Sequence, residues 1–200
     1  MNEIIVLKQI VKNCTYQTKI QNSKFIAYCT KVNSAETVRK RIAEIEDEHR
    51  KADHICWAYR IFQNNDVVAH SSDAGEPHCS AGPPILSAIE GRELVDVVCI
   101  VVRYFGGNKL GIGGLIRAYG STAGKALDQS GAEGYEIMTA LVIGSPMDKY
   151  SDVMRILRKY SAEFQQGFDD RLITFTVRIP LRKREDLLAD LRSIPEIHFT

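Results

Sequence analysis

The densest group of glycines in the chain lies between a short apolar run and a segment with helical periodicity. Five of them fall within residues 106–114, namely Gly106, Gly107, Gly111, Gly113 and Gly114. Glycine tolerates positive φ and lets another molecule approach the backbone without intervening side chains. A loop that leads into a helix N-terminus also presents free N–H groups and the positive end of the helix dipole. This pattern predicts an anion site, with the phosphate of RNA or of a nucleotide as the ligand class.

Three permanent positive charges, Arg103, Lys109 and Arg117, flank these glycines and favour the same ligand. A purely structural interpretation, in which the glycines only form a tight turn and a close contact between helix and sheet, is equally compatible with the spacing. The segment does not match the Walker motif, because Ile112 and Gly113 stand where that motif requires Lys and then Ser or Thr. We therefore expect no ATP hydrolysis.

A second segment, residues 71–82, brings carboxylates, an imidazole, a thiol and hydroxyls into one loop. The Cys79 thiolate, activated by a histidine and oriented by Asp73 or Glu76, would be a nucleophile. Alternatively, the two acids accept hydrogen bonds from backbone N–H groups and shape the loop, as acids beside Gly and Pro often do. The candidate catalytic residues are therefore Asp73, Glu76, Cys79 and, from a neighbouring strand, His54, with no role assigned among them.

The histidines and cysteines near this loop also have the side chains that bind zinc. The candidates are His54, Cys56, His70, His78 and Cys79. Their spacing contains no paired CxxC or HxxxH element, so we expect no metal ion, and the sequence indicates no cofactor.

Hydrophobic periodicity predicts the elements that position both segments. Residues 97–102 form a continuous apolar run, which is typical of a strand covered on both faces and therefore central in its sheet. The other elements predicted for this part are two extended stretches within 14–32, a helix over 33–50 with a capping box of Asn33 and Glu36, a hairpin over 55–68 that turns at Asn64, a helix from Pro83 to Gly91, and a helix whose buried stripe is Leu115, Ile116, Tyr119, Ala123 and Leu127.

Beyond Gly134 the pattern changes to a strand, a helix, two strands, a helix and a last strand. The predicted ranges are 137–143, 147–160 with Ser145 as the cap, 163–167, 172–179, 184–192 and 197–199. This βαββαβ order is that of the ferredoxin-like fold. We therefore predict an α+β protein with two domains, 1–134 and 135–200.

Composition limits the classes of function. The 26 Lys and Arg residues nearly balance the 25 Asp and Glu residues, so no general positive field would hold the protein on nucleic acid. The five scattered cysteines and the absence of a secretory signal predict a reducing, cytoplasmic location. No apolar run approaches the roughly 20 residues of a membrane span, so we expect no membrane contact.

Several motifs together resemble the IMPACT/YigZ family in its bacterial form. They are the segments 73–77, 81–86 and 101–119 and the strand with His54, Cys56, Ala58, Tyr59 and Arg60. The resemblance implies an N-terminal β/α domain similar to domain 2 of ribosomal protein S-five and to domain IV of elongation factor G. It also implies a C-terminal domain similar to domain V of that factor. The chain departs from the family's acidic loop at Ala74, His78, Cys79 and Ser80, where the family usually has a glycine in place of Cys79.

These observations predict a non-catalytic protein that binds ribosomal or other structured RNA, or translation factors, and regulates translation. In this hypothesis Arg103, Lys109 and Arg117 hold phosphate together with the N–H groups of the glycine loop. The alternative is an enzyme that binds a phosphorylated ligand at this loop and uses Glu76 or Asp73 as its base. The sequence leaves the oligomeric state open.

Overall fold

A computed structural model describes residues 7–63, 66–168 and 172–199 and divides the chain into two compact units, 1–135 and 136–200. The sequence places the division one residue earlier, after Gly134. The hairpin turn expected at Asn64 lies outside the described residues. Each unit has its own hydrophobic core.

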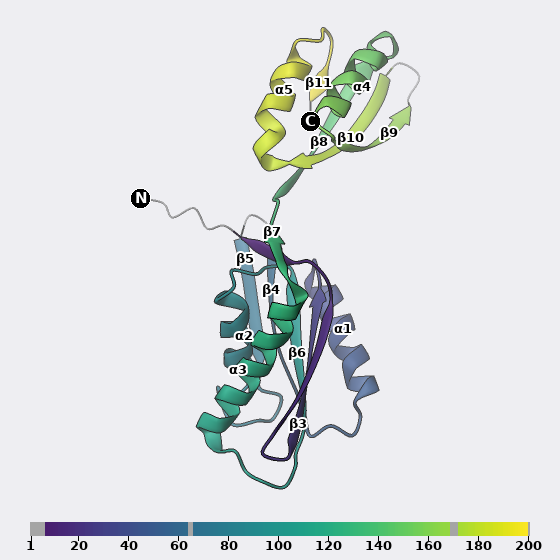
Figure 1. Cartoon of the computed structure of the whole chain (residues 1–200). Coiled ribbons are helices and arrows are strands. Elements are labelled where there is room, and N and C mark those ends of the chain that lie inside the picture. Colours follow the sequence, from purple (N-terminus) through teal and green to yellow (C-terminus); the bar gives the residue numbers. More distant parts are fainter. Residues whose placement is uncertain (1–6, 64–65, 169–171, 200) are drawn as a thin grey trace. The chain divides into compact units, whose positions relative to one another are not determined.

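The first unit is built on a five-stranded sheet in which all neighbours are antiparallel. The strand order is β2-β3-β6-β4-β5 (Figure 1). The strands are β2 (Cys14–Ile20), β3 (Ser23–Lys31), β6 (Val97–Tyr104), β4 (His54–Gln63) and β5 (Asp66–Ser72). The apolar run thus forms the central strand, β6, in which every residue before Tyr104 is buried.

Helices cover both faces of this sheet (Figure 1). On one face α2 (Gly82–Glu90) and α3 (Gly111–Ser130) pack over a core that includes Ile85, Leu115 and Tyr119. On the other face α1 (Ala35–Glu48) buries Val38, Ile42 and Ile45. The side chains of β6 therefore alternate between two apolar layers, which explains why its sequence shows no polar alternation.

Two details of these helices differ from the sequence-based predictions. The capping box of α1 consists of Ser34 and Thr37, because Ser34 has the extended backbone of a cap and its hydroxyl accepts a hydrogen bond from the Thr37 N–H. The predicted box of Asn33 and Glu36 is wrong by one position. Ile116 is 40% exposed, because the buried face of α3 is centred on Leu115 and neighbouring residues lie 100° away around the helix.

A small antiparallel sheet of β1 (Lys8–Ile10) and β7 (Ala132–Gly134) was not predicted. The two strands have only three residues each, and β7 is fully exposed, so neither has an apolar pattern. The N–H groups of Lys8 and Val95 further connect this sheet to the chain before β6.

The second unit is ferredoxin-like, as the βαββαβ order predicts. Its sheet has the order β11-β8-β10-β9, and both helices pack on one core. The elements are β8 (Met138–Pro146), the 3-10 turn η1 (Met147–Lys149), α4 (Tyr150–Lys159), β9 (Glu163–Phe168), β10 (Leu172–Pro180), the 3-10 turn η2 (Leu181–Lys183), α5 (Arg184–Arg192) and β11 (His198–Phe199). The predicted cap is wrong, because β8 continues through Ser145, whose hydroxyl donates to the carbonyl of Pro146.

Among the helices that the structure describes, none combines the length and the apolar character that crossing a lipid bilayer requires.

Candidate functional site

The acidic loop between β5 and α2 is organised by the Asp73 carboxylate. It accepts hydrogen bonds from the backbone N–H groups of Cys79 (2.8 Å), Ala81 (2.9 Å) and Gly82 (2.8 Å). Burial opposes ionisation of this carboxyl, but the three donors outweigh it and lower the pKa of Asp73. The side chain of the helix-capping residue Ala81 cannot accept a hydrogen bond, so Asp73 supplies the cap of α2 from eight residues upstream.

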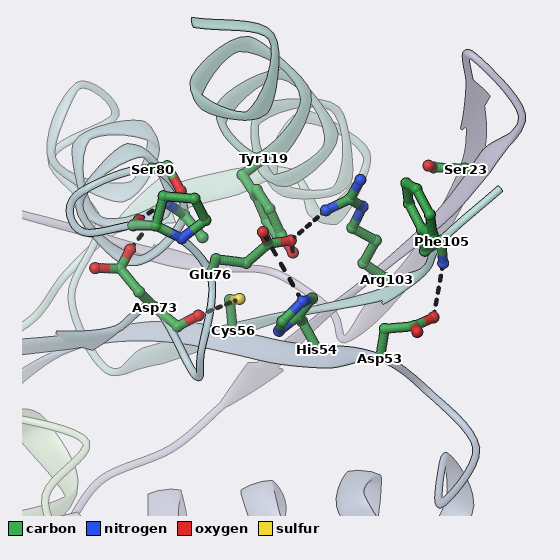
Figure 2. A network of polar contacts seen from close by, with 12 residues as sticks. Ser23, Asp53, His54, Cys56, Asp73, Glu76, Ser80, Arg103, Phe105 and Tyr119 are labelled. Atoms are coloured by element: carbon green, nitrogen blue, oxygen red, sulfur yellow. Dashed lines mark hydrogen bonds and ion pairs between the residues drawn. The ribbon is translucent and has the colours of Figure 1, made fainter. Parts of the chain in front are cut away.

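Glu76, in the same loop, is directed into the protein and is only 8% exposed. One of its oxygens, Oε1, accepts hydrogen bonds from Nη1 of Arg103 and from the hydroxyl of Tyr119, both at 2.7 Å (Figure 2). Burial raises the pKa of Tyr119 far above its usual value, and the neighbouring Cys56 and Glu76 add to this effect. Tyr119 therefore remains a neutral donor. The three side chains tie the acidic loop to the end of β6 and to α3.

His54 begins β4 and lies beside this network (Figure 2). Its Nδ1 is 3.0 Å from the carbonyl oxygen of Ala74, which can only accept, so Nδ1 carries a proton. Its Nε2 lies 4.0 Å from Oε2 of Glu76.

Two residues further along β4, the Cys56 thiol donates to the Asp73 carbonyl at 3.0 Å, and burial raises the pKa of Cys56 to about 12. This thiol is therefore a structural donor rather than a nucleophile.

A cavity of about 370 Å³ opens next to Glu76, His54 and Arg103. One part of its wall is apolar and comes from Pro77, Phe105, Leu110, Ile112 and Leu115. The other part is polar and is lined by Asp53, His54, Glu76, Arg103 and Lys109. A pocket that combines apolar walls with a few convergent polar groups is the usual form of a ligand site.

The glycine loop forms the rim of this cavity and is fixed at its start. The N–H of Phe105 donates to Oδ2 of Asp53 at 2.7 Å, and the N–H of Gly106 donates to the Ser23 hydroxyl at 3.2 Å. A Cβ at Gly106 would overlap the backbone of Asn22, so this glycine is required by a close approach of two chain segments.

Two of the later glycines have no such close neighbour. Gly107 and Gly111 have φ values of +90° and +69° and would meet no atom within 4 Å if a Cβ were added. Gly111 and Gly113 are exposed, and Gly114 lies against the Leu110 side chain. The structural interpretation thus applies at Gly106, whereas an anion site at the later glycines stays a prediction.

The three predicted cations do not act alike. The side chain of Arg103 is only 6% exposed, and it faces Glu76 and the rings of Phe25 and Phe105. Lys109 and Arg117 are exposed, and neither has an acidic partner within the part of the chain that the structure describes. Only these two present free charge to a ligand outside the cavity.

The predicted catalytic candidates fall into two groups. His54 and Glu76 come together at the cavity, whereas Asp73 and Cys79 do not line it. Cys79 is exposed, and its sulfur lies 3.4 Å from Nε2 of His78, whose Nδ1 is 4.0 Å from Asp73. The His78 side chain, which would have to link the other two, is 95% exposed and is not packed against the protein. Within the described residues no group of three or more His, Cys, Asp or Glu side chains is arranged to hold a metal ion.

Sequence reasoning missed Asp53, Phe105, Leu110 and Tyr119 as members of the site. Tyr119 was predicted only as a core residue of its helix. Asp53 directly precedes β4, and Phe105 directly follows β6. This position beside a strand was the only feature of the sequence that could have indicated a role in the site.

Comparison with known proteins gives consistent results. Residues 21–127 match the family model of the Impact N-terminal domain. An IMPACT family member of Haemophilus influenzae is 36% identical over 170 residues, which cover 84% of this chain and 81% of that protein. The IMPACT family member YigZ of Escherichia coli is 26% identical over 178 residues, 88% of this chain and 87% of that one. A crystal structure of a hypothetical protein shares the fold, with a TM-score of 0.76, 23% identity and coverage of 96% and 95%.

Proposed function

The chain belongs to the IMPACT family, and we propose that it is a non-catalytic regulator of translation that binds structured RNA of the ribosome at the start of α3. The observation that carries this proposal is the exposed start of α3 at Gly111 and Gly113, with the uncompensated charges of Lys109 and Arg117 beside it. The resemblance to domains of ribosomal protein S-five and elongation factor G supports RNA as the ligand. A shared fold does not by itself fix a function, so the site must carry the argument.

The start of α3 is suited to phosphate because no side chain among the described residues caps it. The helix is 20 residues long, its capping residue Leu110 offers no side-chain acceptor, and its first turn contains no acid. The first N–H groups of a helix have no partner within the helix, and the dipole makes this end positive. A phosphate placed there would accept these N–H groups and meet the two cations.

The surroundings favour a macromolecule over a free anion. Phe105, Ile112 and Ile116 are 44%, 60% and 40% exposed. Ile112 and Ile116 are four residues apart on α3 and therefore lie on the same side of the helix. Apolar and aromatic groups next to free cations suit RNA, whose bases stack on aromatic rings while its phosphates pair with Lys and Arg.

The test is the salt dependence of binding to ribosomal RNA fragments. Each phosphate contact contributes about 0.7 to 0.9 to the slope of log affinity against log salt, so Lys109→Ala and Arg117→Ala should each flatten the slope by nearly one unit. Lys40→Ala is the matched control, because Lys40 is exposed on α1, which covers the opposite face of the sheet. Slopes that stay unchanged in both variants, with wild-type affinity, would refute this site.

The cavity supports a second candidate, an enzyme acting on a phosphorylated small molecule with Glu76 as base. Against it, Oε1 of Glu76 is already occupied by hydrogen bonds from Arg103 and Tyr119, which leaves only Oε2 to take up a proton from a substrate. A thermal-shift screen would identify ligands, since binding to the native state alone raises the melting temperature. This candidate requires that such a ligand is chemically converted, as followed by NMR, and that Glu76→Gln stops the conversion. A ligand that binds and stays intact counts against it.

A further inference from the structure

We infer that the cavity beside Glu76 binds one unstacked nucleotide, with the base inside and the phosphate at the rim. The inference rests on the proposed function, because the nucleotide would belong to the bound RNA. Its basis is the combination of cavity size, the exposed ring of Phe105 and a set of buried polar groups that the protein itself does not fully satisfy.

The size of the cavity fits a single nucleotide and excludes paired RNA. Its volume of about 370 Å³ lies near the lower end of the range for small-molecule pockets. A base within a duplex is covered by its neighbours above and below. Sequence-specific proteins therefore bind loops and bulges, whose bases can be turned out and enclosed. The cavity selects for such an extruded base.

The walls suit a flat heterocycle. Phe105 is 44% exposed, and the centroid of its ring lies 5.3 Å from the guanidinium carbon of Arg103. Leu110 and Leu115 complete the apolar wall. Aromatic rings and guanidinium planes are the groups on which proteins stack unpaired bases.

The polar groups of the cavity leave hydrogen-bonding capacity for the edge of a base. Oε1 of Glu76 accepts two hydrogen bonds, whereas Oε2 has only the His54 ring at 4.0 Å within the described residues. Arg103 is 5% exposed, and its Nε is buried without a hydrogen-bond partner among the described residues. Buried donors almost always have an acceptor, so an unpaired one beside a cavity is free to donate to a ligand that enters it.

This arrangement favours a base with an exocyclic amino group. The free carboxylate oxygen accepts but cannot donate, and the amino groups of adenine, cytosine and guanine are donors. Uracil has no amino group, and its one donor on this edge, N3–H, lies between two carbonyl oxygens that the carboxylate repels. At the rim, Lys109 and the exposed N–H groups after Gly111 lie where the phosphate of the same nucleotide would emerge.

The experiment compares two RNA duplexes by fluorescence anisotropy, one fully paired and one that differs from it only by a single bulged adenosine. We expect the bulged RNA to bind more tightly, and Phe105→Ala to weaken it roughly tenfold while weakening the paired RNA far less. Phe168→Ala is the control, because Phe168 is a 64% exposed phenylalanine of the second unit. Phe105→Leu, which keeps most of the side-chain volume, should give the same loss if the ring itself matters. Replacing the bulged adenosine with uridine should cost roughly tenfold.

The outcomes separate this inference from the proposed function. Equal binding of both RNAs, or an equal loss for both in Phe105→Ala, overturns the nucleotide site and leaves the RNA surface standing. If neither RNA binds, the proposed function fails. A titration with adenosine 5′-monophosphate, followed by NMR, then tests whether the cavity binds a free nucleotide. Shift changes at Leu110 and Gly111 that disappear in Phe105→Ala would retain the cavity as a site for a free nucleotide. Their absence would overturn it.

Discussion

The carboxylate of Glu76 and the guanidinium of Arg103 lie 2.7 Å apart, and the two side chains are 3% and 6% exposed. Removing two charges from water is costly, and further contacts to the pair offset part of this cost. Tyr119 supplies one such contact to the carboxylate, and the rings of Phe25 and Phe105 cover the guanidinium. The pair therefore fixes the acidic loop against β6 and α3 and holds the cavity in one shape.

Removing either partner should leave a buried charge unpaired. We expect Glu76→Ala and Arg103→Met each to lower the free energy of unfolding by about 3 kcal/mol or more. The double variant should cost clearly less than the sum, because it leaves no isolated charge. Urea denaturation of the wild type, the two single variants and the double variant measures these free energies of unfolding. Costs below about 1 kcal/mol for both single variants would mean that solvent reaches the pair.

This pair also shows what a sequence can and cannot predict. The central strand β6 and the helices α2 and α3 follow from runs and periodicities that the sequence displays directly, as does the βαββαβ order of the second unit. Contacts between residues far apart in sequence have no such signature. Glu76 and Arg103 are 27 positions apart, and their contact depends on how the loop folds over the sheet.

Arg103 illustrates the same limit at the candidate site. Beside the glycines it was predicted to bind phosphate, and its charge gave no hint that a buried carboxylate would meet it. The short sheet of β1 and β7 could not be predicted for another reason, since its pairing joins residues more than 120 positions apart through backbone groups that any sequence provides. By contrast, the exposure of Gly111 and Lys109 follows from the loop being polar and rich in glycine.

The five cysteines should differ sharply in reactivity, because the thiolate is the reactive form. Cys79 is exposed, whereas burial raises the pKa of Cys56 to about 12. At pH 8 we expect iodoacetamide to modify Cys79 first and Cys56 at least about 100-fold more slowly in the native protein. Peptide mass spectrometry follows each site, and Cys79→Ser should remove the fastest phase.

The buried pair Cys29 and Cys99 provides an internal comparison. Their sulfurs are 3.6 Å apart, and their hydrogen bond, with burial, raises the pKa of Cys29. Both should be modified only after denaturation, together with Cys56. Rapid modification of Cys56 under native conditions would show that the loop over it opens readily and that its thiol is not the fixed donor to Asp73.

The glycines can be tested by adding a single methyl group. At Gly106 the new Cβ would overlap the Asn22 backbone, which cannot move without disturbing the β2–β3 turn. We expect Gly106→Ala to destabilise the first unit by about 2 kcal/mol or more, in the range of overpacked sites. Gly134→Ala is the control, because its Cβ would meet no atom within 4 Å and its φ is not positive. Similar unfolding free energies for the two variants would argue against the close approach.

Asp73 should make stability depend on pH in a defined direction. Its pKa in the folded protein lies below the value of about 3.9 expected for the unfolded chain, so the folded state binds its proton less readily. The stabilisation is then complete above about pH 5 and declines as pH falls through the folded pKa. Asp73→Ala should cost about 1 to 2 kcal/mol at pH 6, as loss of a helix cap does. Toward pH 3 the difference from wild type should shrink, because the wild-type carboxyl becomes protonated.

Urea unfolding of wild type, Asp73→Ala and Glu46→Gln at pH 6 and pH 3 tests this expectation. Glu46 is exposed on α1, and its substitution should leave both values near wild type. A cost for Asp73→Ala that is the same at both pH values would mean that the shape of the side chain, rather than its charge, holds the loop. The three N–H donors of Cys79, Ala81 and Gly82 would then need another acceptor, and the structure offers them only Asp73 among the described residues.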